Sequence, residues 1–248
     1  MRRKKNWQDF MGDLRERSEI PWQEIRDAEA GPTSGVGHKK PGKRISAKTP
    51  NQQVYLNSMS DHTVTLCTGP AGCGKTYMAC GLAANWLYDD KIKKIILTRP
   101  IVECGQRLGA LPGTLGEKTD PYMAPMFDAF GDFLDPKFIK TCRQNQTIEV
   151  VPLETMRGRT FHDAVIILDE AQNVTRRQMK MFMTRFGQNS KVIVCGDVTQ
   201  TDLPHSEGNP LMWVCERLGH PDIAKVVLGP EDVQRHGLIR HILERLGE

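Results

Sequence analysis

Short apolar runs alternate with longer amphipathic segments from residue 51 to the end of the chain. The runs have the length of buried strands, and the segments between them repeat their apolar residues at helical spacing. Strands that are apolar on both sides are typical of a parallel sheet covered by helices on both faces. We therefore expect an α/β fold with strands at 64–68, 94–98, 148–151, 165–168, 192–195 and 224–228, and helices at 75–88, 176–186, 210–218 and 232–246.

The chain before this alternation has a different pattern. Residues 6–29 place apolar side chains at helical spacing on both sides of Pro21, which predicts two short amphipathic helices. The residues from 30 to 47 are rich in Gly, Pro, Ser and Lys, which is the composition of a linker. We therefore expect a helical extension at 1–29, a basic linker at 30–47 and one α/β domain at 48–248. That domain contains an insertion at 105–143, with a helical stretch near 122–133.

The 248 residues suit one such domain with appendages, and the charge is concentrated at its beginning. Residues 1–50 contain 12 Lys and Arg against 7 Asp and Glu, whereas the remainder contains 22 against 23. The net charge of +4 therefore comes from the segment before the nucleotide-binding motifs described below. This basic segment is either an electrostatic handle for nucleic acid or a solvated tail, and the two interpretations are compatible.

Two classes of protein are disfavoured by composition. No apolar run approaches the length of a membrane span, and the basic residues at 2–5 are not followed by an apolar signal segment. We therefore expect a cytoplasmic protein without a membrane partner. The seven cysteines include no Cys-x-x-Cys pair, so we interpret them as small core or loop residues in a reducing compartment rather than as zinc ligands.

A glycine-rich motif follows the first predicted strand. Its glycines allow a tight turn whose backbone N–H groups face a polyphosphate, and the helix that starts after it directs its positive dipole end at the same anion. Lys75 can reach the β and γ phosphates, and Thr76 can ligate Mg²⁺. The motif predicts that ATP is bound with Mg²⁺ by Gly69, Pro70, Ala71, Gly72, Cys73, Gly74, Lys75, Thr76 and Tyr77.

Polar residues also follow two later strands, at the sheet edge where ligands of such folds bind. Asp169 ends the strand at 165–168 and can hold Mg²⁺ opposite Thr76. Glu170 comes next and can activate the attacking water. Gln200 follows the strand at 192–195, where its amide can sense the γ phosphate, and Asp197 can orient neighbouring groups. These positions indicate hydrolysis as well as binding.

The pattern leaves the roles of other polar residues open. Gln52 precedes the first strand and can read adenine, or it belongs to a helix-capping segment led by Thr49 or Asn51. Several arginines fit contacts to the phosphates of a nucleic acid or to a transferred phosphate, or they are salt-bridging surface residues. These arginines are Arg99, Arg157 and Arg159, and a further arginine, Arg235, lies near the start of the last predicted helix.

Together these motifs resemble those of the PhoH-like ATPases over residues 45–245. The matching segments are 69–76, Thr-Arg-Pro at 98–100, Leu-Gly-Ala-Leu-Pro-Gly at 108–113, Lys-Thr-Asp-Pro-Tyr at 118–122, Met-Arg-Gly-Arg-Thr at 156–160, Leu-Asp-Glu-Ala-Gln-Asn at 168–173, Gln-Met-Lys-Met-Phe at 178–182, Gly-Asp-Val-Thr-Gln at 196–200 and Asp-Val-Gln-Arg-His at 232–236. The resemblance implies a RecA-like core similar to the first motor domain of superfamily 1 helicases. It also implies an adenine-reading Gln52 and an arginine finger at Arg235, and the compact form is reminiscent of phage-encoded members.

The expected function is ATP hydrolysis coupled to binding or remodelling of RNA or single-stranded DNA. Because we expect one motor domain where a monomeric helicase has two, we predict a homo-oligomeric ring, most simply a hexamer. Arg235 or Arg159 would then act on the nucleotide of the neighbouring subunit. The alternative is a nucleotide-gated adaptor that binds a protein partner, such as an RNA-processing factor or a nuclease, without unwinding. A small-molecule kinase is disfavoured because Glu170 is placed for water.

Overall fold

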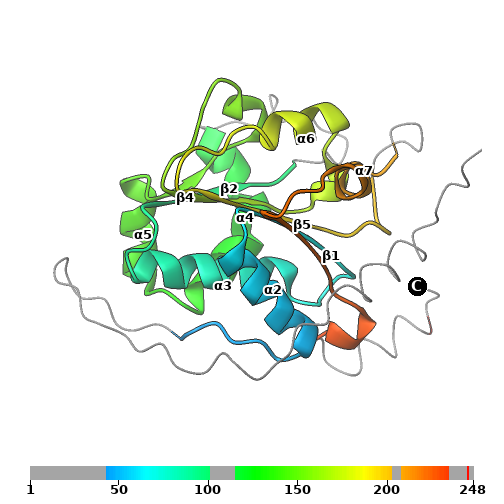
Figure 1. Ribbon diagram of the computed structural model, residues 1–248. Helices are drawn as coiled ribbons and strands as arrows, with labels where there is room; N and C mark the ends of the chain where they lie inside the picture. Colours follow the sequence, from blue (N-terminus) through cyan, green and yellow to red (C-terminus); the bar gives the residue numbers. More distant parts are fainter. Residues whose placement is uncertain (1–42, 101–114, 203–207, 235–244, 246–248) are drawn as a thin grey trace, which may run out of the picture.

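The computed structural model describes residues 43–100, 115–202, 208–234 and 245 (Figure 1). Six strands form one sheet in the order β3-β2-β4-β5-β1-β6, and every strand pairing is parallel. The strands are β1 (Val64–Thr68), β2 (Lys94–Thr98), β3 (Ile148–Val150), β4 (Ala164–Leu168), β5 (Lys191–Gly196) and β6 (Ile223–Val227). All six predicted strands are confirmed, with ends that differ by at most one residue from those expected.

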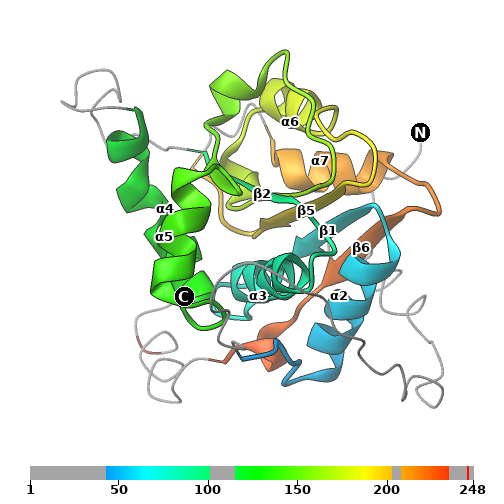
Figure 2. The same cartoon turned by 90° about the vertical axis from the view of Figure 1, so that its left-hand side faces the viewer.

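Helices cover both faces of the sheet (Figures 1 and 2). One face carries α2 (Pro50–Asp61), α3 (Lys75–Tyr88), α4 (Leu115–Gly131) and α5 (Pro136–Gln144), and the other carries α6 (Arg176–Phe182) and α7 (Pro210–Arg217). Successive residues of a strand point to opposite faces, so each strand contributes to two cores. In β4, Val165 and Ile167 pack with the first group of helices, whereas Ile166 and Leu168 pack with the second.

The strand register brings the carboxyl ends of neighbouring strands together at one edge of the sheet. Thr68, the last residue of β1, lies opposite Gly196 of β5 and Val227 of β6. Leu168 at the end of β4 lies opposite Thr98 of β2. The segments that follow β1, β2, β4 and β5 therefore emerge at one edge of the sheet.

Helix α3 has the bounds that its pattern predicts, and α7 ends one residue earlier than expected. The helical stretch expected near 122–133 is α4, which begins earlier and ends at Gly131. Other helices differ more. Helix α6 ends at Phe182 instead of residue 186, because the chain then turns to form an isolated parallel bridge between Phe161 and Phe186. Helices α2 and α5 were not predicted, although Thr49 does cap α2, as one interpretation of that segment required. Residues Pro230–Asp232 form a short 3-10 turn, so the predicted start of the last helix at Asp232 is wrong.

Several expectations concern residues outside the described ranges. These are the helices within 6–29, the linker up to residue 42, the insertion segment 101–114, and the remainder of the last predicted helix except Arg245.

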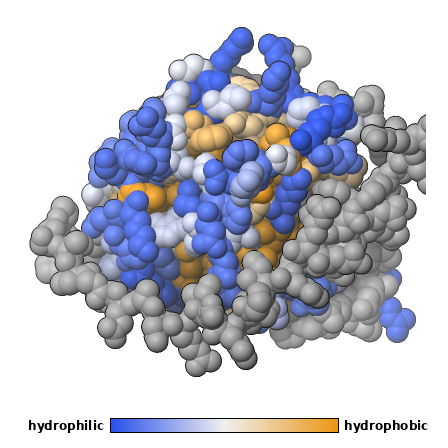
Figure 3. Space-filling model, viewed as in Figure 1, coloured by the Kyte–Doolittle hydropathy of each residue, from blue (hydrophilic) through white to orange (hydrophobic). Residues whose placement is uncertain are grey.

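The surface and the cysteines agree with a domain that buries its apolar residues. On the face drawn in Figure 3, hydrophilic side chains surround smaller apolar areas. In the described part of the chain, no helix combines the length and apolarity that a membrane span requires.

The six described cysteines are all buried and free, which confirms their interpretation as core or loop residues: Cys67, Cys73, Cys80, Cys142, Cys195 and Cys215.

Candidate nucleotide site

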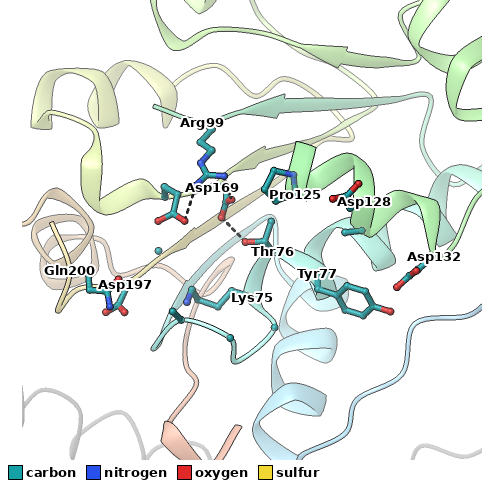
Figure 4. Close-up of a pocket in the computed structure, with 16 residues that line it drawn as sticks. Lys75, Thr76, Tyr77, Arg99, Pro125, Asp128, Asp132, Asp169, Asp197 and Gln200 are labelled. Atoms are coloured by element: carbon teal, nitrogen blue, oxygen red, sulfur yellow. Dashed lines mark hydrogen bonds and ion pairs between the residues drawn. The ribbon is translucent and has the colours of Figure 1, made fainter. Parts of the chain in front are cut away.

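The predicted phosphate loop connects β1 to α3 (Figure 4). Gly72 and Gly74 have φ values of 84° and 90°, in the left-handed region that favours glycine. Gly74 is the N-cap of α3 and supplies no side-chain cap, so the first turn of the helix is available to an anion. A Cβ at Gly69 would approach the backbone oxygen of Leu228 to 2.6 Å, so this position also requires glycine. The loop therefore has the backbone of a phosphate cradle.

Lys75 at the start of α3 points along this loop. Its Nζ donates hydrogen bonds to the backbone oxygens of Gly69 at 2.7 Å and Pro70 at 2.9 Å. These are contacts that an ammonium group exchanges readily for phosphate oxygens, since the lysine acts as a compact point charge.

Thr76 and Asp169 meet across the sheet edge. The Thr76 hydroxyl donates a hydrogen bond of 2.6 Å to Asp169 Oδ1, and the Asp169 side chain is buried at the end of β4. Burial raises the pKa of the Asp169 carboxyl and the neighbouring Glu170 raises it further, while the bond from Thr76 and the charge of Arg99 oppose the shift. A hydroxyl and a carboxylate are ligands that Mg²⁺ prefers. The chemistry of this pair therefore fits a magnesium site.

Glu170 is held by two side chains beside this pair. It adopts a left-handed backbone conformation with φ of 52°, and 38% of its side chain is exposed. Its Oε1 lies 3.2 Å from Arg99 Nη2, and its Oε2 accepts a hydrogen bond of 2.6 Å from Gln172 Nε2. Gln172 is buried and also accepts from the backbone N–H of Asp197 at 2.9 Å. Gln172 thus connects the catalytic candidate to the end of β5, a role that the sequence motifs do not reveal.

These groups line a cavity of about 600 Å³, within the size range of small-molecule sites. The structure brings together these predicted residues: Ala71, Gly72, Gly74, Lys75, Thr76, Tyr77, Arg99, Asp169, Glu170, Asp197 and Gln200. Helix α4 contributes Pro125 and Asp128, and Asp132 lies directly after this helix; none of the three was predicted (Figure 4). This side of the cavity is acidic because Asp128 and Asp132 both line it. Burial and the Asp132 carboxylate raise the pKa of the neighbouring Tyr77 hydroxyl.

A second cavity of about 300 Å³ adjoins the first and shares three of its residues, Arg99, Glu170 and Gln200. Arg99 also donates to the backbone oxygen of Tyr122 at 3.3 Å, which fixes its position between the two cavities.

Three predicted site residues lie elsewhere or outside the description. Arg159 forms a two-pronged ion pair with Glu149, at 2.7 and 3.0 Å, and lines neither cavity. Arg157 is exposed, and Arg235 lies outside the described residues.

Gln52 is close to the loop but does not face the cavity. Only 3% of it is exposed, and its amide bonds to the backbone at both ends. Thr49 Oγ1 accepts from the N–H of Gln52 at 3.2 Å, so the capping interpretation of this segment is confirmed.

Comparison with known sequences agrees with these motifs. The family described as PhoH-like protein matches residues 44–246. A PhoH-like protein of Mycobacterium leprae is 49% identical over 208 residues, which are 84% of this chain and 60% of that protein. Protein PhoH of Escherichia coli K12 is 41% identical over 202 residues, which are 80% of this chain and 57% of that protein. The chain thus spans about 60% of the length of such relatives.

Comparison with solved structures concerns the fold alone. The large terminase of a thermophilic bacteriophage, in complex with ADP, matches with a TM-score of 0.50 and 12% identity. The match covers 80% of this chain and 50% of the terminase chain. The resemblance found in the motifs is confirmed: the chain belongs to the PhoH-like protein family and has the RecA-like fold of P-loop NTPases.

Proposed function

We propose that this domain hydrolyses ATP in the larger cavity and that single-stranded nucleic acid, RNA or DNA, regulates the hydrolysis. One observation supports hydrolysis above all others. The Thr76–Asp169 pair, at 2.6 Å, and Glu170 line the same cavity as the phosphate loop. A site that only binds a nucleotide has no need of a partly exposed carboxylate beside the metal ligands.

The roles of the residues follow from their positions. Thr76 and Asp169 would hold Mg²⁺, which, when bound, neutralises phosphate charge. Lys75 exchanges its loop oxygens for oxygens of the β and γ phosphates. Glu170 orients a water molecule and accepts its proton, and Gln172 keeps that carboxylate in place. Gln200 lines the same cavity and is the candidate sensor of the γ phosphate.

Arg99 supports the link to nucleic acid. It lines both cavities and lies 3.2 Å from Glu170, so a phosphate that engages Arg99 in the second cavity would change the charge beside the water-activating carboxylate. Arginine suits this exchange because its guanidinium pairs with carboxylates and phosphates in the same geometry. Arg157, which is exposed, and the basic segment before the domain extend the candidate contact surface.

The proposed assembly is a homo-oligomeric ring, most simply a hexamer. A RecA-like domain of this kind needs an arginine on the γ phosphate. Arg159 is paired with Glu149 away from the cavity, and Arg235 is the other candidate, so we propose that a neighbouring subunit supplies this arginine.

The test is ATPase activity with and without RNA and single-stranded DNA, together with native mass measurement. Lys75→Ala should prevent turnover by weakening triphosphate binding. Glu170→Gln should retain ATP but slow turnover by at least about 100-fold, because a positioned base contributes that much. Normal hydrolysis by Glu170→Gln would contradict the assignment. Stimulation by a protein partner alone would favour the adaptor function.

A further inference from the structure

Two glutamines hold the outer side of the phosphate loop. The side-chain amide of Gln52 donates a hydrogen bond of 3.0 Å to the backbone oxygen of Cys73. The backbone N–H of Gln234 donates one of 3.0 Å to the backbone oxygen of Gly72. In a trans peptide the C=O and N–H groups point in opposite directions. Holding these two carbonyls outward therefore turns the following N–H groups, of Cys73 and Gly74, toward the phosphate side.

Both polar atoms of the Gln52 amide form hydrogen bonds with the protein backbone. Its Oε1 accepts a hydrogen bond of 2.8 Å from the backbone N–H of Lys48, while its Nε2 bonds Cys73. A Cβ at Gly74 would lie 3.3 Å from Gln52 Nε2, so the amide packs directly against the loop. Reading adenine would require this amide to face the base, but only 3% of Gln52 is exposed and both of its polar atoms already bond to the backbone.

A buried carboxylate joins the two supports. Asp232 is fully buried and accepts hydrogen bonds from the N–H of Gly229 at 2.7 Å, from Asn51 Nδ2 at 3.0 Å and from the Thr49 hydroxyl. It thereby links the start of α2, which carries Gln52, to the segment that carries Gln234. We call Thr49, Asn51, Gln52, Asp232 and Gln234 the loop clamp.

We infer that Gln52 is a positioning residue that sets the affinity of the loop for the triphosphate, independently of the base. The inference rests on the proposed nucleotide site and gives Gln52 a role different from adenine reading. Its effect on affinity passes through the Cys73 carbonyl to the N–H of Gly74 in the same peptide, which is directed to the phosphate side of the loop and not toward a base. ATP, GTP and inorganic tripolyphosphate should therefore depend on Gln52 to the same extent.

The test is equilibrium binding of these three ligands to the full chain carrying Gln52→Glu. A glutamate still accepts from Lys48 but, when ionised, cannot donate to Cys73, so the loop loses one support. Its added negative charge also repels all three ligands, and this second effect is separated by the uncharged variant described below. Affinity for each ligand should fall about tenfold, the effect of one lost hydrogen bond in a buried site, and the ATP-to-GTP ratio should stay constant. In turnover, KM should rise while kcat at saturation stays within about twofold.

The control is Gln53→Glu, one residue along α2, where the amide bonds only Asn57 of the same helix. This variant should bind all three ligands normally. Gln52→Met removes both amide hydrogen bonds with an uncharged side chain of similar shape, so it should weaken binding of all three ligands about tenfold without charge repulsion. It also serves as the test if Gln52→Glu does not fold.

Three outcomes are decisive. A loss confined to ATP would overturn the inference and restore adenine reading, and unchanged affinity for all three ligands would show that the clamp has no influence. Because binding is measured without turnover, a protein that binds these ligands but never hydrolyses ATP would contradict the proposed function and leave the inference intact.

Discussion

Asp169 is a carboxylate in a place where a negative charge is poorly solvated. Its pKa is raised, chiefly by burial, so the ionised form costs stability at every pH above the folded-state pKa. Asp169→Asn keeps an acceptor for the Thr76 hydroxyl but removes the charge. The variant should lose Mg²⁺-dependent ATPase activity and yet be at least as stable as the parent protein without magnesium.

The pH dependence gives the sign of this effect. Below about pH 4, the ordinary pKa of aspartate, the carboxyl is protonated in both the folded and the unfolded protein, so its ionisation does not affect the stability difference between parent and variant. As the pH rises toward about 7, the unfolded chain ionises more readily than the folded protein, because burial raises the folded-state pKa. The stability difference should therefore grow in favour of Asp169→Asn in urea titrations. Equal stability differences at both pH values would show that the buried charge is compensated.

Asp163 supplies a matched control with the opposite sign. It is exposed, and hydrogen bonds from Asn189 and Lys93 lower the pKa of its carboxyl. Its charge stabilises the fold above the unfolded-state pKa, and this contribution is lost as pH falls through the folded-state pKa. Asp163→Asn, which also tolerates the local φ of 51°, should therefore be slightly less stable at neutral pH.

Helices α3 and α4 lie side by side (Figure 2). Both contribute to the cavity: Lys75 and Thr76 come from α3, and Asp128 comes from α4. Gly81 of α3 faces the segment that follows α4, and a Cβ there would be 2.7 Å from Cζ of the buried Phe133. Alanine in a helix gains about 1 kcal/mol over glycine, but overpacking a core costs about 1–3 kcal/mol. The Phe133 ring is fixed against Tyr77, with centroids 5.2 Å apart, so the second effect should win.

Gly81→Ala should accordingly lower the unfolding free energy by up to about 2 kcal/mol in urea titrations. Gly131→Ala, at the end of α4, is the control because a Cβ there meets nothing within 4 Å, and it should be neutral or slightly stabilising. A stabilised Gly81→Ala protein would mean that the contact with Phe133 yields easily.

At the level of elements, the apolar pattern was sufficient for the sheet because buried parallel strands leave little ambiguity. It was also sufficient for α3, which starts in the phosphate loop. It was insufficient for α6, because the end of this helix is set by the bridge between Phe161 and Phe186. These two residues lie far apart in the sequence, so a local pattern does not show that they pair. The pattern also could not place α4 against α3, since the bounds of a helix do not specify its neighbour.

The candidate site shows the same limit. The loop and the Asp169–Glu170 pair are local motifs, and the structure brings them together as expected. Residue type shows that Gln52 has a donor and an acceptor, but not that backbone groups occupy both. The sequence likewise does not reveal that Arg99 contacts Glu170 and Arg159 contacts Glu149, since pairings of charges depend on the folded chain.

At the scale of the whole molecule, the ring is the prediction with the largest consequence. If Arg235 completes the site of a neighbouring subunit, a subunit with Glu170→Gln still offers its arginine, and a subunit with Arg235→Ala still offers its carboxylate. Each variant alone should be nearly inactive, because every site in its ring lacks one group.

Mixing the two variants under conditions that allow subunit exchange should then restore activity. With random assembly from equal amounts, one interface in four pairs an intact Glu170 with an intact Arg235, so activity should return to roughly a quarter of the parent value. Arg159→Ala in place of Arg235→Ala distinguishes the two candidate arginines in the same assay. Failure of both mixtures, with rings demonstrated by native mass measurement, would mean that each site takes its arginine from its own chain. In that case Arg99, which already lies 3.2 Å from Glu170, becomes the residue to test.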